Sequence, residues 1–342
     1  MFLFRSVRPS DLKQILQLAR MLSGVNLSNT QDELQKQIQT SQASFSGEIR
    51  NKKDALYLFC IEDLNTSRIV GTSMIFAQHG SKESPHYFFQ LLRLEKFSQT
   101  IHSGIVHQVL RLGYDVDGPT EVGGIVLHPD YRHTPEKLGK VLSWGRFMYM
   151  AMHRRRFKDR VIAELMPPLT PDGKSLLWEA IGQKFTNLPY IEADKISQKN
   201  KEFITSLFPR QDIYVSLLDA RTREIIGQVG EESLPARAML EKIGFKFLSM
   251  IDPFDGGPHY GVRMKDITIV KITKPYKFRK AKVRSFKETG LVVKETAGEF
   301  MAVFTPYEIV SKCLTLPAEG RDVLKLEIGE RSYVLPFPTT KT

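Results

Sequence analysis

The stretch VLHPDYRHTPEKLGKVLS, residues 126–143, carries side chains whose type and spacing suit the binding of an anion. A strand-like run ends near Leu127, a basic loop follows, and a helix is predicted to open at Gly139. Backbone N–H groups at a helix start point outward, and the helix dipole favours negative charge there. Further positive charge comes from Arg132, His133, Lys137 and Lys140. The stretch therefore predicts a pyrophosphate site; the alternative is an ordinary strand-to-helix turn with a solvated basic rim.

Other reactive residues show none of the spacings that are typical of metal, nucleotide or hydrolase sites. The eight histidines form no His-x-x-x-His pair and no cluster with cysteine, so we predict no metal site. No Walker-type or dinucleotide glycine fingerprint occurs, and no Gly-x-Ser-x-Gly elbow. Cys60 and Cys313 lie far apart in apolar runs. We expect them to be buried thiols rather than a disulfide, which suits a reducing cytoplasm.

Composition places the chain among globular proteins. Its 342 residues, 42% hydrophobic and 25% charged, fit one large domain or two smaller ones. No apolar run reaches the roughly 18–20 residues of a membrane helix. The start, MFLFRSVRPSDL, has its arginines after the apolar residues and lacks a small-residue cleavage site, so we do not expect a secretory signal.

Basic residues are concentrated in two places. Between residues 265 and 287 nine lysines and arginines face one acid, a local net charge of +8 within a total of +11, and HRRRFKDR at 153–160 forms a second cluster. Such patches favour nucleic acid, acidic membrane surfaces or a phosphorylated cofactor. A solvated face without any ligand is the alternative interpretation. Nucleic-acid binding is the less favoured use of residues 265–287, because they contain no recognisable motif.

Hydrophobic periodicity predicts alternating helices and strands. A strand at FLFRSV precedes a helix over RPSDLKQILQLARMLS. A second helix is predicted at TQDELQKQI, with Thr30 and Glu33 as its capping box, and residues 55–76 read as a hairpin. Residues 77–118 show no clear pattern and are expected to be irregular. Residues 120–166 read as strand, loop, helix and strand, a unit typical of parallel sheets.

Two later features bear on domain organisation. LLWEAIGQKFTNL and AMLEKIGFKFLSM share a plan of helix, glycine (Gly182, Gly244) and a strand opening at Lys-Phe, which would indicate two related lobes. After about residue 268 short strands separated by turns predict a small β-rich module. We therefore expect an α/β fold, with one region over 1–267 and a β-rich module over 268–342.

The sequence resembles a known family. The strand, basic loop and helix at 120–152 resemble the acyl-CoA pyrophosphate site of GNAT N-acyltransferases. A wider set resembles arginine N-succinyltransferases: GGIVLHPDYR, LSWGRFMYMA, VIAEL, YIEADKISQKNKEFITSLFPR, IYVSLL, IIGQV, PARAMLEKIGF and IDPFDGGP. The likeness runs from about residue 5 to 270. It implies a GNAT-like mixed sheet with flanking helices. Because members of the family associate as oligomers, it also implies that this chain forms a homo- or hetero-oligomer.

The resemblance implies transfer of a succinyl group from succinyl-CoA to the α-amino group of arginine, or of ornithine, in arginine catabolism. Succinyl-CoA would be a co-substrate, with no permanently bound cofactor. Resemblance places Ile125, with Val126 and Leu127, at the succinyl-CoA chain, where a strand edge can pair with the pantetheine amides. It places the loop from Arg132 to Leu138, Gly139 and Lys140 at the pyrophosphate. Asp255, in DPFDGGPHY, would pair with the guanidinium of arginine; a tight turn is the alternative.

The chain departs from the family pattern at two points. Its loop RHTPEKLGK is longer than the family's and keeps only Gly139, so the backbone approaches phosphate less easily. The family's proton-donor histidine is replaced by Gly230. His259 and Glu121, and the surface acids Glu231 and Glu232, are the candidates to replace it, each with an ordinary structural role as alternative. Loss of this histidine also leaves open an acyl-CoA-binding relative with weak or no catalysis, acting as a partner subunit or sensor.

Overall fold

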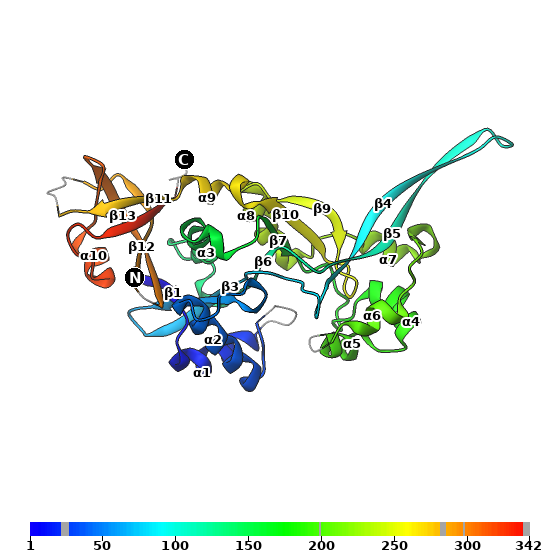
Figure 1. Cartoon of the computed structure of the whole chain (residues 1–342), viewed down its shortest axis with the longest axis horizontal. Coiled ribbons are helices and arrows are strands. Elements are labelled where there is room, and N and C mark those ends of the chain that lie inside the picture. The colour runs from blue at the N-terminus through cyan, green and yellow to red at the C-terminus, as the bar shows by residue number, and fades with distance from the viewer. Residues whose placement is uncertain (22–26, 198–199, 281–284, 297, 338–342) are drawn as a thin grey trace. The chain divides into compact units, whose positions relative to one another are not determined.

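The computed structural model describes residues 1–21, 27–197, 200–280, 285–296 and 298–337 (Figure 1). The chain divides into two compact units. Unit 1 comprises residues 1–78, 120–159 and 263–342, and unit 2 comprises residues 79–119 and 160–262. The predicted boundary between residues 267 and 268 stays a prediction, and the residues on either side of it belong to the same compact unit.

Unit 1 contains a sheet whose neighbouring strands run in the order β12, β15, β11, β14, β13, β1, β2, β3 and β6. Its strands are β1 (Phe2–Ser6), β2 (Leu56–Asp63), β3 (Arg68–Phe76), β6 (Thr120–Leu127), β11 (Lys274–Phe278), β12 (Glu288–Thr296), β13 (Glu299–Val310), β14 (Cys313–Thr315) and β15 (Arg331–Pro336). Its helices are α1 (Leu12–Ala19), α2 (Gln31–Ser46), α3 (Leu138–Met152), α9 (Thr268–Ile272) and α10 (Ala318–Leu324). The predicted hairpin at 55–76 and the β-rich character after residue 268 are confirmed.

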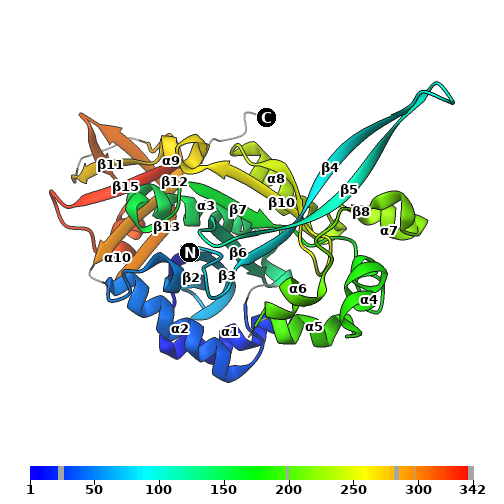
Figure 2. The ribbon, with the colours of Figure 1, turned by 45° about the vertical axis from the view of Figure 1, so that its right-hand side comes forward.

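Helices cover both faces of the central strands of unit 1, with α1 and α2 on one face and α3 on the other (Figure 2). Side chains of β2 point alternately to the two faces. Leu58 and Cys60 join the apolar cluster beneath α1 and α2, whereas Tyr57 and Phe59 contact the ring of Tyr149 on α3. This double coverage explains why β2 reads as a nearly continuous apolar run.

Unit 2 contains strands in the order β7, β10, β9, β4, β5 and β8. They are β4 (His86–Ser98), β5 (Ser103–Asp115), β7 (Arg160–Glu164), β8 (Ile213–Tyr214), β9 (Lys246–Ile251) and β10 (Pro258–Arg263). The helices are α4 (Gln183–Thr186), α5 (Tyr190–Ser197), α6 (Glu202–Leu207), α7 (Ala220–Ile225) and α8 (Leu234–Lys242). Their core is centred on Trp178, whose ring stacks on Phe254 with centroids 5.0 Å apart.

The expectation that residues 77–118 are irregular was wrong. β4 and β5 are 13-residue strands that pair along their whole length as an antiparallel hairpin (Figure 1). Much of the hairpin is exposed on both faces, and Phe97 and Ile105 are 63% and 58% exposed. Because much of the hairpin lacks a buried face, the alternation of apolar and polar residues is confined to short runs, such as Leu110 to Val116, and does not extend over either strand.

The predicted repeat of helix, glycine and strand holds at one glycine and fails at the other. Gly244 ends the segment after α8 with a φ of +109° and leads into β9. Gly182 has helical backbone angles, and the Lys-Phe after it lies within α4 instead of opening a strand. A Cβ on Gly182 would lie 2.3 Å from the ring of Trp178, so this glycine permits close packing and ends no helix.

The remaining expectations concern cysteines, membranes and the basic stretch. Cys60 and Cys313 are free thiols, and burial raises the pKa of Cys60 to about 12. Among the described residues, no helix combines the length and apolar character that crossing a bilayer requires. Within the basic stretch 265–287, Lys282 and Arg284 lie outside the described residues.

Candidate active site

The strand predicted to bind the acyl-CoA chain contains a β-bulge. The register of β6 against β3 shifts between Thr72 and Met74, so that Gly124 and Ile125 together oppose one residue of β3. Gly124 has a φ of +57°, a left-handed conformation that glycine adopts without steric cost. A bulge leaves its extra residue outside the regular ladder. This geometry suits the predicted contact of Ile125 with an extended amide chain.

The guanidinium of Arg146, on α3, binds the backbone of both strands at one end of this bulge, where Met74 pairs with Gly123. Its Nη1 donates to the carbonyl oxygens of Gly123 at 3.0 Å and Met74 at 3.5 Å. The side chain is 2% exposed, and burial lowers its pKa to about 9. Because a buried charge is costly unless it is hydrogen-bonded, we infer that these bonds fix the position of the bulge.

The predicted pyrophosphate loop leads into α3, which begins at Leu138, one residue before the predicted start at Gly139. Arg132 and Lys137 are exposed, and Lys137 precedes the helix with a φ of +55°. A Cβ on Gly139 would have its nearest neighbour 3.9 Å away, at Leu127. The fold therefore does not require a glycine at 139, and the backbone there is open to approach.

The side chains of three other predicted residues of unit 1 are buried or packed against neighbouring side chains. The Nζ of Lys140 lies 3.9 Å from the ring centroid of Trp144 and 4.5 Å from that of Phe337, a cation–π geometry. Val126 is 1% exposed, so it can meet a ligand only through its backbone. Glu121, at the start of β6, is 2% exposed.

Gly230, His259 and Asp255, the other predicted catalytic and acceptor residues, belong to unit 2. The N–H of Gly230 donates to the carbonyl of Met166 at 2.8 Å. Its φ of −64° suits any residue, but a Cβ would lie 2.7 Å from the carbonyl oxygen of Pro167. A histidine at position 230 would therefore require the backbone of residues 166–167 to move.

Two residues before Met166, the carboxylate of Glu164 ends β7 among histidines. Its Oε1 lies 3.0 Å from Nε2 of His86 and 3.5 Å from Nε2 of His259. His259 is 0% exposed, whereas the side chain of Glu164 is 25% exposed. Burial alone would raise the pKa of Glu164, but the charge of His259 and the hydrogen bond with His86 hold it well below its ordinary value.

Asp255 lies in the tight turn that the sequence predicted. Its Oδ1 accepts a hydrogen bond from the N–H of Gly257 at 2.7 Å, and Asp252 opens the same turn. Burial, together with the charges of Asp252, Glu164 and Asp194, raises the pKa of Asp255 well above its ordinary value. This part of unit 2 therefore gathers carboxylates that repel one another.

Removing the charge of Asp252 is expected to stabilise the protein at neutral pH. Burial, and then the charge of Glu164, raises the pKa of Asp252 to about 6. The folded state thus holds its proton up to a higher pH than the unfolded state, so the wild type loses stability as the pH rises from about 4 to 6. Asp252→Asn should raise the free energy of unfolding by about 1–3 kcal/mol above pH 6.

The advantage of Asp252→Asn should shrink below pH 6 and vanish near pH 4, which urea unfolding at several pH values would measure. The N–H groups of Phe254 and Asp255 both donate to Oδ1 of Asp252, at 2.7 and 3.0 Å, and asparagine keeps that acceptor. A gain that is independent of pH, or no gain, would contradict the assigned cause.

The gathering of His79, His86 and His259 near Glu164 could not be read from the sequence. The four residues come from separate segments, and His86 and Glu164 alone are 78 positions apart in the sequence. No local spacing relates them, so only the pairing of the strands in unit 2 could have revealed them. The sequence predicts His259 to lie in the DPFDGGPHY loop; in the structure it lies on β10.

Comparisons with known proteins agree over nearly the whole chain. The family described as "Arginine N-succinyltransferase beta subunit" matches residues 2–269. The chain is 32% identical to an arginine N-succinyltransferase from Photorhabdus laumondii over 97% of each chain. It is 30% identical to one from Escherichia coli strain 55989, over 97% of this chain and 96% of the relative.

A solved structure gives the same fold. Arginine/ornithine succinyltransferase subunit AI from Pseudomonas aeruginosa superposes with a TM-score of 0.85 and 26% identity, covering 99% of each chain. This likeness confirms the predicted mixed α/β architecture. With a family match over most of its length and relatives of at least 30% identity, the chain belongs to the arginine N-succinyltransferase family.

Proposed function

We propose that the protein transfers the succinyl group of succinyl-CoA to the α-amino group of arginine or ornithine. The observation that carries this proposal is the bulged strand β6 leading through a basic loop into α3, in a chain of this family. The amine attacks the thioester carbonyl, a C–N bond forms and the C–S bond breaks. The amine's proton must leave, and the CoA thiolate must gain one.

Acyl-CoA is proposed to bind along β6 and at the start of α3. The backbone of Ile125, Val126 and Leu127 would pair with the pantetheine amides next to the bulge. The pyrophosphate would meet the exposed Arg132 and the open backbone at Leu138 and Gly139. Lys140 would add long-range positive charge from its position over two aromatic rings.

The acceptor's guanidinium is proposed to bind at Asp255. A cation placed beside this carboxylate would relieve its repulsion with Asp252, Glu164 and Asp194. Such relief favours a cationic amino acid over a neutral one. The hydrogen bond from Gly257 already holds one oxygen of Asp255, so the guanidinium would use the other.

A histidine within unit 2 is proposed to take over the role lost at Gly230. His259 is fully buried and cannot meet the substrate, but it lies 3.5 Å from Glu164, whose side chain is partly exposed. Glu164 is close to the family's proton-donor position, because the N–H of Gly230 binds Met166, two residues further along. We propose that His259 supplies the proton through Glu164. Glu121 would act as the base through water.

An assay of thiol release tests the proposed function. With succinyl-CoA, arginine or ornithine should release CoA faster than neutral amino acids such as glutamine. A mass spectrum of the product should show the added succinyl group on the α-nitrogen. Absence of thiol release with any amine, combined with measurable CoA binding, would refute the proposal.

That negative outcome would support a second candidate, an acyl-CoA-binding relative with little or no catalysis. The observation in its favour is Gly230 itself: the resemblance assigns this position to the family's proton donor, and a Cβ there would lie 2.7 Å from the carbonyl oxygen of Pro167. The family description names a beta subunit and the solved relative is a subunit AI. We propose that this chain also assembles with a second chain, in the reducing cytoplasm that its free cysteines suit.

A further inference from the structure

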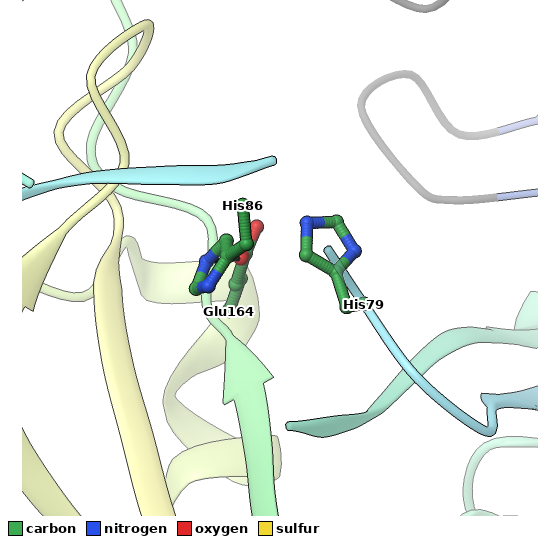
Figure 3. A group of neighbouring side chains, drawn as sticks. All are labelled: His79, His86 and Glu164. Atoms are coloured by element: carbon green, nitrogen blue, oxygen red, sulfur yellow. Dashed lines mark hydrogen bonds and ion pairs between the residues drawn. The ribbon is translucent and has the colours of Figure 1, made fainter. Parts of the chain in front are cut away.

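Three side chains of unit 2 converge in a way that suits a metal ion. One ligand atom from each of His79, His86 and Glu164 lies within 4.8 Å of the others. Figure 3 shows Glu164 at the end of β7 beside His86, with the ring of His79 turned toward them from another segment. The rings of His79 and His86 stand edge to face, with centroids 4.6 Å apart.

The backbone fixes these residues before any ion arrives. The N–H of His79 donates to the carbonyl of Pro119 at 2.7 Å, and Gly80 follows with a φ of +101°. A turn closed by a hydrogen bond from Ser81 to Ser84 then returns the chain to His86, the first residue of β4. Ligands held at strand ends and tight turns are preorganised, which favours binding.

The donor set selects the class of ion. Two imidazoles and one carboxylate form the three-ligand set of catalytic zinc sites, in which a fourth position stays open. Magnesium and calcium prefer oxygen ligands throughout, so the two histidines disfavour them. Zinc distances of about 2.0–2.2 Å place tetrahedral donors roughly 3.4 Å apart. His86 and Glu164, at 3.0 Å, are close to that spacing already, and a modest ring rotation would bring in His79.

We propose that His79, His86 and Glu164 bind one divalent transition-metal ion, with zinc as the preferred ion. A second possible group, Glu164, Asp252 and His259, shares the same carboxylate. The first group is favoured because it offers two imidazoles instead of one, and nitrogen donors hold zinc more firmly than additional carboxylates do.

The test uses the full-length, tag-free protein after treatment with a chelator, and no substrate. Titration calorimetry with Zn²⁺ should give one ion per chain, and Co²⁺ should produce the visible absorption of a low-coordinate site. His79→Ala and His86→Ala should each weaken zinc binding by more than about 100-fold, since even outer-shell changes cost 10–100-fold. His107→Ala is the matched control, because His107 is a half-buried histidine of β5 that packs on Tyr214.

Several results would overturn the proposal. One is the absence of stoichiometric zinc binding, which would mean that Glu164 and its histidines form only a buried ion-pair cluster. Another is a result in which His259→Ala loses zinc binding whereas His79→Ala keeps it. That result would place the ion among Glu164, Asp252 and His259. His79 is only half-buried, so His79→Ala should fold even if His86→Ala does not. Binding is measured without acyl-CoA, so failure here leaves the proposed transfer untouched. The proton route through Glu164 is proposed for the metal-free protein, because a bound ion would occupy that carboxylate.

Discussion

Replacing His259 with alanine is expected to lower kcat for succinyl transfer by about 10²–10⁴-fold, the usual contribution of general acid–base catalysis. The imidazole lies 3.5 Å from Glu164 and is wholly buried. Its proposed role is to supply a proton in the transition state, so KM should change much less than kcat. The measurement is steady-state thiol release as a function of arginine concentration and pH.

A purely structural role for His259 makes a different prediction. His259→Gln fills most of the same volume and places an amide near Glu164, but it does not titrate. If His259 passes protons, this variant should keep its stability and remain slow, and the pH–rate profile should lose one limb. Recovery of kcat in His259→Gln, or a profile unchanged from wild type, would show that the ring only fills space beside His86, on which it stacks at 5.2 Å.

Asp11→Ala is expected to destabilise the protein by about 3–5 kcal/mol, the penalty of breaking a buried ion pair from one side. Nη1 and Nη2 of Arg5 bind the two carboxylate oxygens of Asp11 at 2.7 and 2.9 Å. The two residues are 3% and 4% exposed. Burial alone would lower the pKa of Arg5, but the hydrogen bond to Asp11 holds it above its ordinary value. Urea unfolding measures the loss.

A surface pair provides the matched comparison. Arg237 and Glu241 lie 2.9 Å apart on α8 with side chains 43% exposed, so Glu241→Ala should cost no more than about 0.5 kcal/mol. A loss below about 1 kcal/mol for Asp11→Ala would contradict the assigned role. That result would mean that Glu62, which binds Nε of Arg5 at 2.7 Å, or water compensates the buried charge.

Elements with a strong local signal could be predicted from the sequence. The strand, basic loop and helix over 120–152 were found because apolar residues recur at the period of each element. The start of α3 was misplaced by one residue. The bulge at Gly124 was not predicted, since a bulge depends on how β6 registers against β3, and a pair of glycines alone does not specify it.

Features that depend on distant pairing could not be predicted. The β4–β5 hairpin lacks a buried face over much of its length, so hydrophobic alternation covers only short parts of its strands. Gly182 and Gly244 have similar sequence contexts. Gly182 packs against Trp178 within a helical segment, whereas Gly244 ends a helical segment. The cluster around Glu164 unites residues whose separations carry no pattern. The structure of this cluster depends on contacts between residues too far apart in the sequence to form a local pattern.

The close approach of Gly230 to Pro167 has an evolutionary consequence. If a histidine was lost at this position, as the resemblance implies, a reversion would place the new Cβ 2.7 Å from the carbonyl oxygen of Pro167. The ancestral side chain could return only after a compensating change in that neighbouring segment. Such a loss would be hard to reverse, and selection for proton transfer would act on the residues around Glu164 instead of restoring position 230.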